Sequence, residues 1–114
     1  MSLDARVEKA ARAALGKKAE DVVVLDVRRD AQFTDYFLIV SGSNQKQLLA
    51  IADAVIDSLR DDGARPLHTE GYPRREWILL DYDGLVVHIF TPRSRSFYDL
   101  ERLWGGATRR EIAG

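Results

Sequence analysis

The pattern of apolar positions along the chain predicts alternating helices and strands. Two stretches repeat apolar residues at helical spacing, and several short runs are rich in β-branched and aromatic residues, as strands are. We expect the first two strands to be antiparallel. The predicted order, α-β-β-α-β-β-β-α, occupies residues 3–15, 22–27, 36–41, 45–62, 64–68, 77–82, 85–90 and 96–104.

Local signals mark where the second predicted helix begins and ends. Asn44 followed three residues later by Gln47 is typical of a capping box, and Gly63 is a suitable stop. Pro66 places the short strand at 64–68 at an edge of the sheet, because proline cannot donate a ladder hydrogen bond.

The strands at 77–82 and 85–90 are separated only by Asp83-Gly84, which predicts a hairpin with a type I′ turn. A two-residue loop fixes the register and therefore the two faces. The first face is aliphatic and should meet helices: Ile78, Leu80, Tyr82, Leu85, Val87 and Ile89. The second face mixes large apolar groups with a carboxylate and an imidazole: Trp77, Leu79, Asp81, Val86, His88 and Phe90.

Two interpretations of that second face remain open from periodicity. Aromatic residues beside a few polar ones are typical of a protein-binding surface. Alternatively, the C-terminal helix covers the face and His88 is a semi-buried residue with its hydrogen bonds satisfied. In that helix, residues 96–104, the predicted buried side carries Phe97, Leu100, Leu103 and Trp104.

These elements predict an α/β (α+β) fold, a mixed sheet with flanking helices in a single domain at residues 1–104. Residues 105–114 are polar, and we expect an unstructured, flexible tail there. The chain has 114 residues, a length at which a domain folds without disulfides or metals.

Composition removes several classes of function. The chain has no cysteine, which excludes disulfide frameworks, thiol catalysis and cysteine zinc sites. A formal net charge of −1 argues against binding nucleic acid mainly through phosphates, although short arginine clusters at 74–75, 93–95 and 109–110 allow local contacts. No apolar run approaches a membrane span, so we expect a soluble, cytoplasmic protein without a cofactor.

One pattern suggests an enzyme. Gly42-Ser43-Asn44 opens a helix, and Asp81 and Asp83 form a D-x-D pair, as in enzymes that hold a nucleotide and Mg²⁺. The spacing does not fit nucleotidyl transfer, because a helix, a short strand and a loop separate the two features. Asp83 also has a structural role in the turn. A degenerate or active nucleotidyltransferase is therefore the alternative, and we expect no enzyme.

Several sequence blocks in order resemble the bacterial ribosomal silencing factor family, also called the iojap family. They are TDYFLIVSGSNQKQ (34–47), the Glu70-Gly71 loop leading to Trp77, WILLDYDGLVVHIF (77–90) and RSFYDLERLW (95–104). The resemblance ends at Trp104. It implies a nucleotidyltransferase-like core that lacks the catalytic residues.

The resemblance also implies a function. Family members bind the fourteenth large-subunit ribosomal protein at the intersubunit face, prevent joining of the small subunit and lower translation in starvation or stationary phase. Some are homodimers when free, and a minor contact with ribosomal RNA is compatible with the arginine clusters. The partner-binding residues that it implies here are Trp77, Leu79, Asp81, His88 and Glu70.

Overall fold

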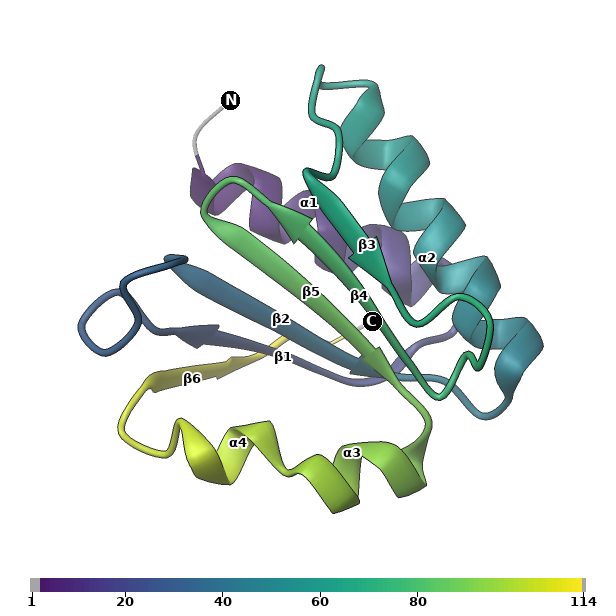
Figure 1. Ribbon diagram of the computed structural model, residues 1–114. Coiled ribbons are helices and arrows are strands. Elements are labelled where there is room, and N and C mark those ends of the chain that lie inside the picture. The colour runs from purple at the N-terminus through teal and green to yellow at the C-terminus, as the bar shows by residue number, and fades with distance from the viewer. Residues whose placement is uncertain (1–2, 114) are drawn as a thin grey trace.

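The computed structural model describes residues 3–113 and shows one mixed sheet with helices on both faces (Figure 1). The six strands lie in the order β3-β4-β5-β2-β1-β6. The elements, in chain order, are α1 Leu3–Gly16, β1 Glu20–Asp26, β2 Tyr36–Ser41, α2 Gln45–Arg60, β3 His68–Glu70, β4 Trp77–Tyr82, β5 Leu85–Phe90, α3 Pro92–Tyr98, α4 Leu100–Leu103 and β6 Thr108–Glu111.

The sheet is mixed, as predicted. The central strands β2 and β5 are parallel, and every other neighbouring pair is antiparallel, including β1 with β2. Helices α1 and α2 pack on one face, whereas α3 and α4 lie across the other (Figure 1). The predicted α/β (α+β) class is therefore confirmed. The specific likeness to a nucleotidyltransferase core stays a prediction of the resemblance.

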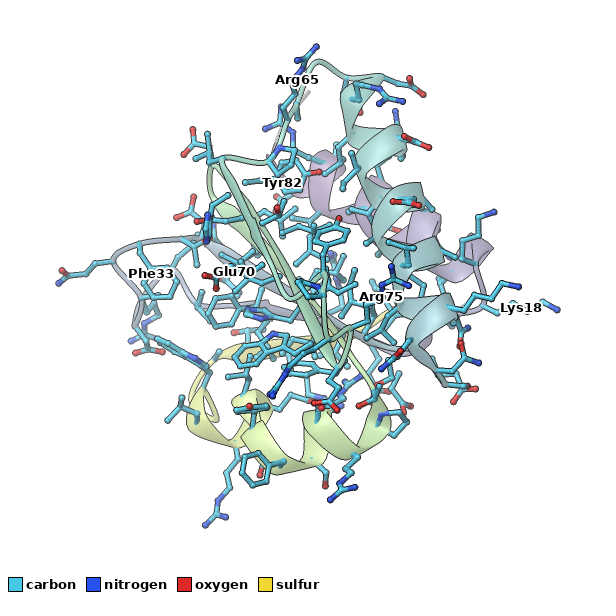
Figure 2. The ribbon with its side chains drawn as sticks, turned by 45° about the vertical axis from the view of Figure 1, so that its right-hand side comes forward. Lys18, Phe33, Arg65, Glu70, Arg75 and Tyr82 are labelled. Carbon is cyan, nitrogen blue, oxygen red and sulfur yellow. The ribbon has the colours of Figure 1, made fainter. Side chains whose placement is uncertain are left out.

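The hairpin register is confirmed residue by residue, from Trp77 opposite Phe90 to Tyr82 opposite Leu85. Its aliphatic face is buried against α1 and α2 in the larger core. Figure 2 shows Tyr82 between the sheet and α2, where its ring is 2% exposed. Burial raises the pKa of the Tyr82 phenol to about 12, because the charged form would lose its hydration.

The turn of that hairpin differs from the prediction. Gly84 has φ of 81°, but Asp83 is not among the residues with positive φ. A type I′ turn needs positive φ at both central positions, so that expectation is wrong. Positive φ at the second position alone is the requirement of a type II turn, which glycine there satisfies.

The start of α2 follows the capping prediction with one change. The Asn44 Oδ1 accepts a hydrogen bond from the Gln47 N–H at 2.8 Å. The Gln47 Oε1 accepts from the N–H of Ser43, at 2.6 Å, and not from that of Asn44. The Ser43 N–H and the Asn44 side chain are thus both hydrogen-bonded within the protein, as at an ordinary helix start.

The strand predicted at 64–68 lies further along the chain, at β3. Pro66 and Leu67 precede it, and the Leu67 N–H donates to the Asp81 carbonyl. Glu70, expected in a loop, is the last residue of β3 and pairs with Leu79. β3 is an edge strand, which agrees with the place predicted for this segment.

The C-terminal helix is longer than predicted and broken. It begins at Pro92 and is interrupted at Asp99, whose φ of 47° is left-handed, so that α3 and α4 are separate helices. The break changes which side chains face the sheet. Leu100 and Trp104 pack against it, but Phe97 and Leu103 are 79% and 72% exposed, contrary to the prediction.

The expectation of an unstructured tail is also wrong for residues 108–111. Residues Thr108–Glu111 form β6, which pairs antiparallel with β1. All four residues are exposed, so the strand is held by backbone hydrogen bonds and not by an apolar face. No helix in the described part of the chain is long and apolar enough to cross a membrane.

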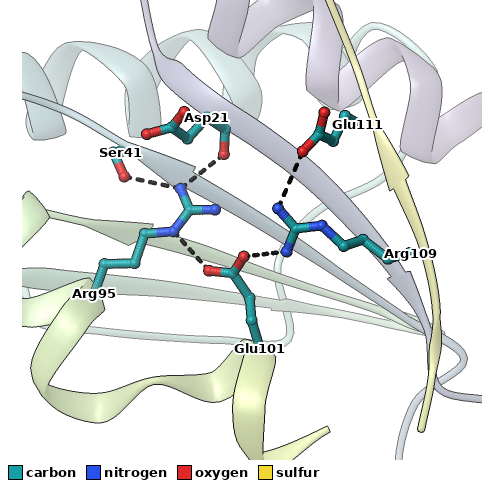
Figure 3. A network of polar contacts seen from close by, with 6 residues as sticks. All are labelled: Asp21, Ser41, Arg95, Glu101, Arg109 and Glu111. Carbon is teal, nitrogen blue, oxygen red and sulfur yellow. Dashed lines mark hydrogen bonds and ion pairs between the residues drawn. The ribbon is translucent and has the colours of Figure 1, made fainter. Parts of the chain in front are cut away.

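A network of polar contacts fastens α3 and α4 to the sheet (Figure 3). The Arg95 guanidinium donates to Glu101 at 2.8 Å, to the Ser41 hydroxyl at 2.8 Å and to the Asp21 carbonyl at 2.7 Å. Arg109 of β6 reaches the other Glu101 oxygen. Partial burial opposes ionisation of Glu101, but the two arginines outweigh it, and the pKa of this carboxyl lies below its usual value.

Candidate functional site

The second face of the hairpin continues across neighbouring strands. By register, Leu79 of β4 lies between Glu70 of β3 and His88 of β5. Side chains of paired residues point to the same face of a sheet, so these groups belong to one surface. The strands thus bring together four of the residues predicted as a site, Trp77, Leu79, Asp81 and His88, and place Glu70 at its edge.

A groove of about 310 Å³ lies on this face. Its floor comes from β2, β4 and β5, one wall from α4 and the segment after it, and one rim from the β1–β2 loop. Figure 2 shows Phe33 on that loop, and its side chain is 67% exposed. The residues that line the groove are Phe33, Phe37, Trp77, Leu79, Asp81, Val86, His88, Leu100 and Trp104.

Aromatic rings run through the groove in contact with one another. Phe37 meets Phe33 at 5.9 Å, Trp104 at 5.4 Å and His88 at 4.9 Å between ring centroids. Such edge-to-face and tilted arrangements are favourable for aromatic rings. A large apolar surface of rigid rings, partly open to solvent, is suited to taking up an apolar side chain of another molecule.

Trp77 is the centre of this arrangement. Its ring stacks on Phe90 with centroids 5.0 Å apart and touches Tyr98 at 4.5 Å. Its indole N–H donates to the Nδ1 of His88 at 3.1 Å. The indole is therefore held on three sides, yet the residue is only half-buried and lines the groove.

His88 is buried, as the second interpretation expects, but its Nε2 has no hydrogen-bond partner among the described residues and the residue still lines the groove. It is 5% exposed, and burial lowers the pKa of its imidazole to about 3. Because Nδ1 accepts from Trp77, the neutral ring carries its proton on Nε2. His88 thus lies in the lining of the groove and accepts a hydrogen bond from Trp77, and its contact with a partner stays a prediction.

This burial predicts an acid-dependent loss of stability. The unfolded state takes up a proton near pH 6.5, whereas the folded state resists it until about pH 3, so stability falls as pH falls between these values. Chemical denaturation at about pH 7 and about pH 5 should show a loss of about 2 kcal/mol from this group.

Leucine binds no proton, so the loss of stability between about pH 7 and about pH 5 should be about 2 kcal/mol smaller in His88→Leu than in the parent protein. An unchanged pH dependence in His88→Leu would show that His88 takes up its proton equally in the folded and unfolded states.

The two carboxylates of the predicted site differ in setting. Asp81 is half-buried and lines the groove among apolar groups. Glu70 is exposed, lies outside the residues that line the groove, and contacts the Nε2 of His68 at 3.1 Å. Asp81 thus offers a negative charge inside the groove, and Glu70 offers one beside it.

Five residues that line the groove were not among the predicted site residues: Val86, which was placed on the same hairpin face, and Phe33, Phe37, Leu100 and Trp104. Phe33 stands alone in a polar connector, RRDAQFTD, and gives no periodic signal. Leu100 and Trp104 were expected to be buried, and they form the wall.

The arrangement offers little for catalysis. Among residues 3–113, no group of three or more histidine or acidic side chains is placed to hold a metal ion. Asp81 points into an apolar groove, and Asp83 lies in the exposed turn. The groove's chemistry is that of an apolar docking site with one carboxylate.

Comparison with known proteins identifies the family to which the chain is similar. A family model described as "Ribosomal silencing factor during starvation" matches residues 1–114, so the expectation that the resemblance ends at Trp104 is wrong. The chain is 41% identical to the ribosomal silencing factor of Bacillus subtilis over 103 residues, which cover 90% of this chain and 87% of that protein.

Two further matches are more distant in sequence. Over 91 residues the chain is 30% identical to a mouse protein named "Mitochondrial assembly of ribosomal large subunit protein 1", covering 77% of this chain and 40% of that one. A solved structure of a protein from Chromobacterium violaceum matches with a TM-score of 0.90 at 29% identity, covering 100% of this chain and 95% of that one. The chain belongs to the ribosomal silencing factor family.

Proposed function

We propose that this protein is a translation repressor that binds the large ribosomal subunit and prevents the small subunit from joining. Membership of the family supports a silencing role, and the name of the mouse relative supports a link to the large subunit. The groove around Trp77 is the observation that carries the proposal, since it is the surface fitted to dock another protein. Its action belongs in the cytoplasm and in starvation or stationary phase.

The proposed partner is the fourteenth large-subunit ribosomal protein, at the intersubunit face. An apolar side chain of that protein would enter the groove against Trp77 and Leu79. A basic side chain beside it would pair with Asp81, and a second with Glu70. A bound body 34 × 33 × 27 Å in extent would then stand where the small subunit must approach.

The mechanism needs no chemical step. Occupying the intersubunit face is enough to prevent joining, and the repressor would leave when its affinity or concentration falls. We therefore propose a binding protein and not an enzyme. A homodimer of the free protein stays a prediction of the resemblance.

Contact with ribosomal RNA would be minor. Arg95 and Arg109 are engaged with Glu101 and hold α3, α4 and β6 in place. Of the arginine clusters, Arg74 and Arg93 are exposed and have no ion pair among the described residues. These two are the side chains proposed for phosphate contacts at the rim of the interface.

Co-sedimentation with isolated subunits tests the binding step. The protein should pellet with purified large subunits at a stoichiometry near one and remain in the supernatant with small subunits. Pre-incubation with antibody to the fourteenth protein should prevent pelleting. Equal association with both subunits, or with neither, would refute the proposal.

The two aspartates of the hairpin form a matched pair. Asp81→Asn should weaken binding to large subunits by about tenfold, because it removes a charge from an apolar groove where a basic partner is expected. Asp83→Asn should leave binding and the hairpin unchanged, because asparagine suits the same turn and Asp83 lies outside the groove. Sedimentation binding curves measure both. A larger loss of binding from Asp83→Asn than from Asp81→Asn would assign the acidic contact to Asp83 in the turn.

A further inference from the structure

The buried imidazole of His88 destabilises the folded protein through one of its two nitrogens. Its Nε2 is buried and has no hydrogen-bond partner among the described residues. A buried polar group left unpaired is destabilising, and an apolar side chain of similar size would avoid that loss. The core around it is apolar, with Ile39, Val86 and Phe90 nearby in the same cluster. Stability alone therefore does not explain a histidine here.

The other nitrogen gives the explanation. Nδ1 accepts the indole N–H of Trp77 at 3.1 Å, and the two rings are 5.8 Å apart. Indole nitrogen can only donate, so Trp77 needs an acceptor if its polar edge is turned into the protein. A carboxylate in that place would bury a charge, whereas a neutral imidazole accepts without one and also stacks on Phe90.

We propose that His88 is a positioning residue that fixes the Trp77 indole in the orientation a partner protein requires. The inference rests on the proposed function and assigns to His88, a 5% exposed residue in the lining of the groove, a role that acts through Trp77. With its N–H satisfied inside, Trp77 presents only apolar ring surface to the groove. With Phe90 and Tyr98 against its faces, the indole is held in one rotamer before the partner arrives.

Pre-organisation of this kind improves affinity because the side chain loses little freedom on binding. It also keeps the groove open: an indole that turned to find solvent for its N–H would move away from Phe90 and alter the floor. His88 therefore acts on binding through Trp77, and its effect should vanish when Trp77 lacks the N–H.

Three variants test this role. His88→Leu removes the acceptor and keeps apolar volume, and His88→Asn places an amide oxygen near the position of Nδ1. Trp77→Phe removes the donor. The chain has two tryptophans, so the indole N–H of Trp104 is an internal reference in ¹H–¹⁵N spectra.

In His88→Leu, the Trp77 indole proton should shift and exchange with solvent about tenfold faster, while that of Trp104 stays unchanged, because one hydrogen bond is lost. Binding to isolated large subunits should weaken about tenfold, the effect of a lost pre-organising contact. His88→Asn should recover part of both. In the Trp77→Phe background, His88→Leu should change affinity less than about twofold, since the pair is already broken.

The proposal is overturned if the Trp77 indole signal is the same in His88→Leu and the parent, or if the affinity loss is equal in the Trp77→Phe background. If His88→Leu fails to fold, the ¹⁵N shifts of His88 in the parent protein test the proposal instead. Protonation at Nδ1 instead of Nε2 would exclude the hydrogen bond and overturn it. These spectra need no ribosome. Failure of the parent protein to bind large subunits would refute the proposed function. The spectra would still test whether His88 holds the Trp77 indole.

Discussion

Replacing Trp77 by alanine should abolish binding to the large ribosomal subunit while the protein stays folded. The indole lines the groove and contacts Phe90, Tyr98 and His88. Truncation of a central aromatic anchor typically costs about 3 kcal/mol in binding, or more than about a hundredfold in Kd. The measurement is a binding curve by co-sedimentation.

The same change lowers stability, so the control matters. Trp77 is half-buried, and its truncation should reduce the free energy of unfolding by about 2 kcal/mol, within what a domain of this size tolerates. Phe97→Ala is the matched aromatic truncation: Phe97 lies outside the groove and is 79% exposed. It should bind as the parent does. Normal binding by a folded Trp77→Ala protein would remove the groove from the interface.

Replacing Gly71 by alanine should have the largest effect on stability. Gly71 has φ of 90°, and a Cβ there would lie 1.8 Å from the carbonyl oxygen of Trp77. That oxygen is backbone and cannot rotate away, so the loop between β3 and β4 must open. We expect a loss of at least about 3 kcal/mol in the free energy of unfolding, from strain and overlap together. Binding should fall too, because the shift starts at Trp77.

Gly63→Ala separates the two causes of that loss. Gly63 also has positive φ, 81°, but a Cβ there would meet no atom within 4 Å. The left-handed conformation alone costs about 1 kcal/mol for alanine. Thermal or chemical denaturation of both variants gives the comparison. Equal losses would mean that the contact between Gly71 and Trp77 relaxes freely and that only the backbone angle matters.

The hairpin was the most predictable part of the molecule. Two residues between two strands leave one register, and the register assigns Trp77, Leu79, Asp81 and His88 to one face without any further knowledge. The capping role of Asn44 was equally predictable, because it depends only on neighbours in sequence. Local rules were sufficient for the register and for the Asn44 cap, but not for the type of the turn, where φ is positive at Gly84 and not at Asp83.

The groove itself could not be predicted, because its walls come from distant segments. Phe33 and Trp104 meet at 6.3 Å, although 71 positions separate them, and neither belongs to a periodic pattern that reveals the other. The break at Asp99 gave no sequence signal, and it decides that Leu100 faces the groove while Leu103 does not. The strand at Thr108–Glu111 was missed because backbone pairing, and not an alternating apolar face, holds it.

The burial of His88 illustrates a limit of another kind. Periodicity placed it correctly beside Trp77, but depth depends on what covers the strand. The Phe37 ring from β2 meets the His88 ring edge-on, and residues of the C-terminal segment pack on the same face, so His88 is only 5% exposed. Of the predicted contacts, Trp77, Leu79, Asp81 and His88 line the groove, and Glu70 stands at its edge.

A subunit-joining assay tests the central claim most directly. Purified small and large subunits are mixed under joining conditions with increasing protein, and joined ribosomes are measured by gradient sedimentation. The parent protein should reduce joined ribosomes in proportion to its occupancy of large subunits, and folded Trp77→Ala at the same concentration should not. Undiminished joining with the parent protein bound to every large subunit would contradict the proposed function.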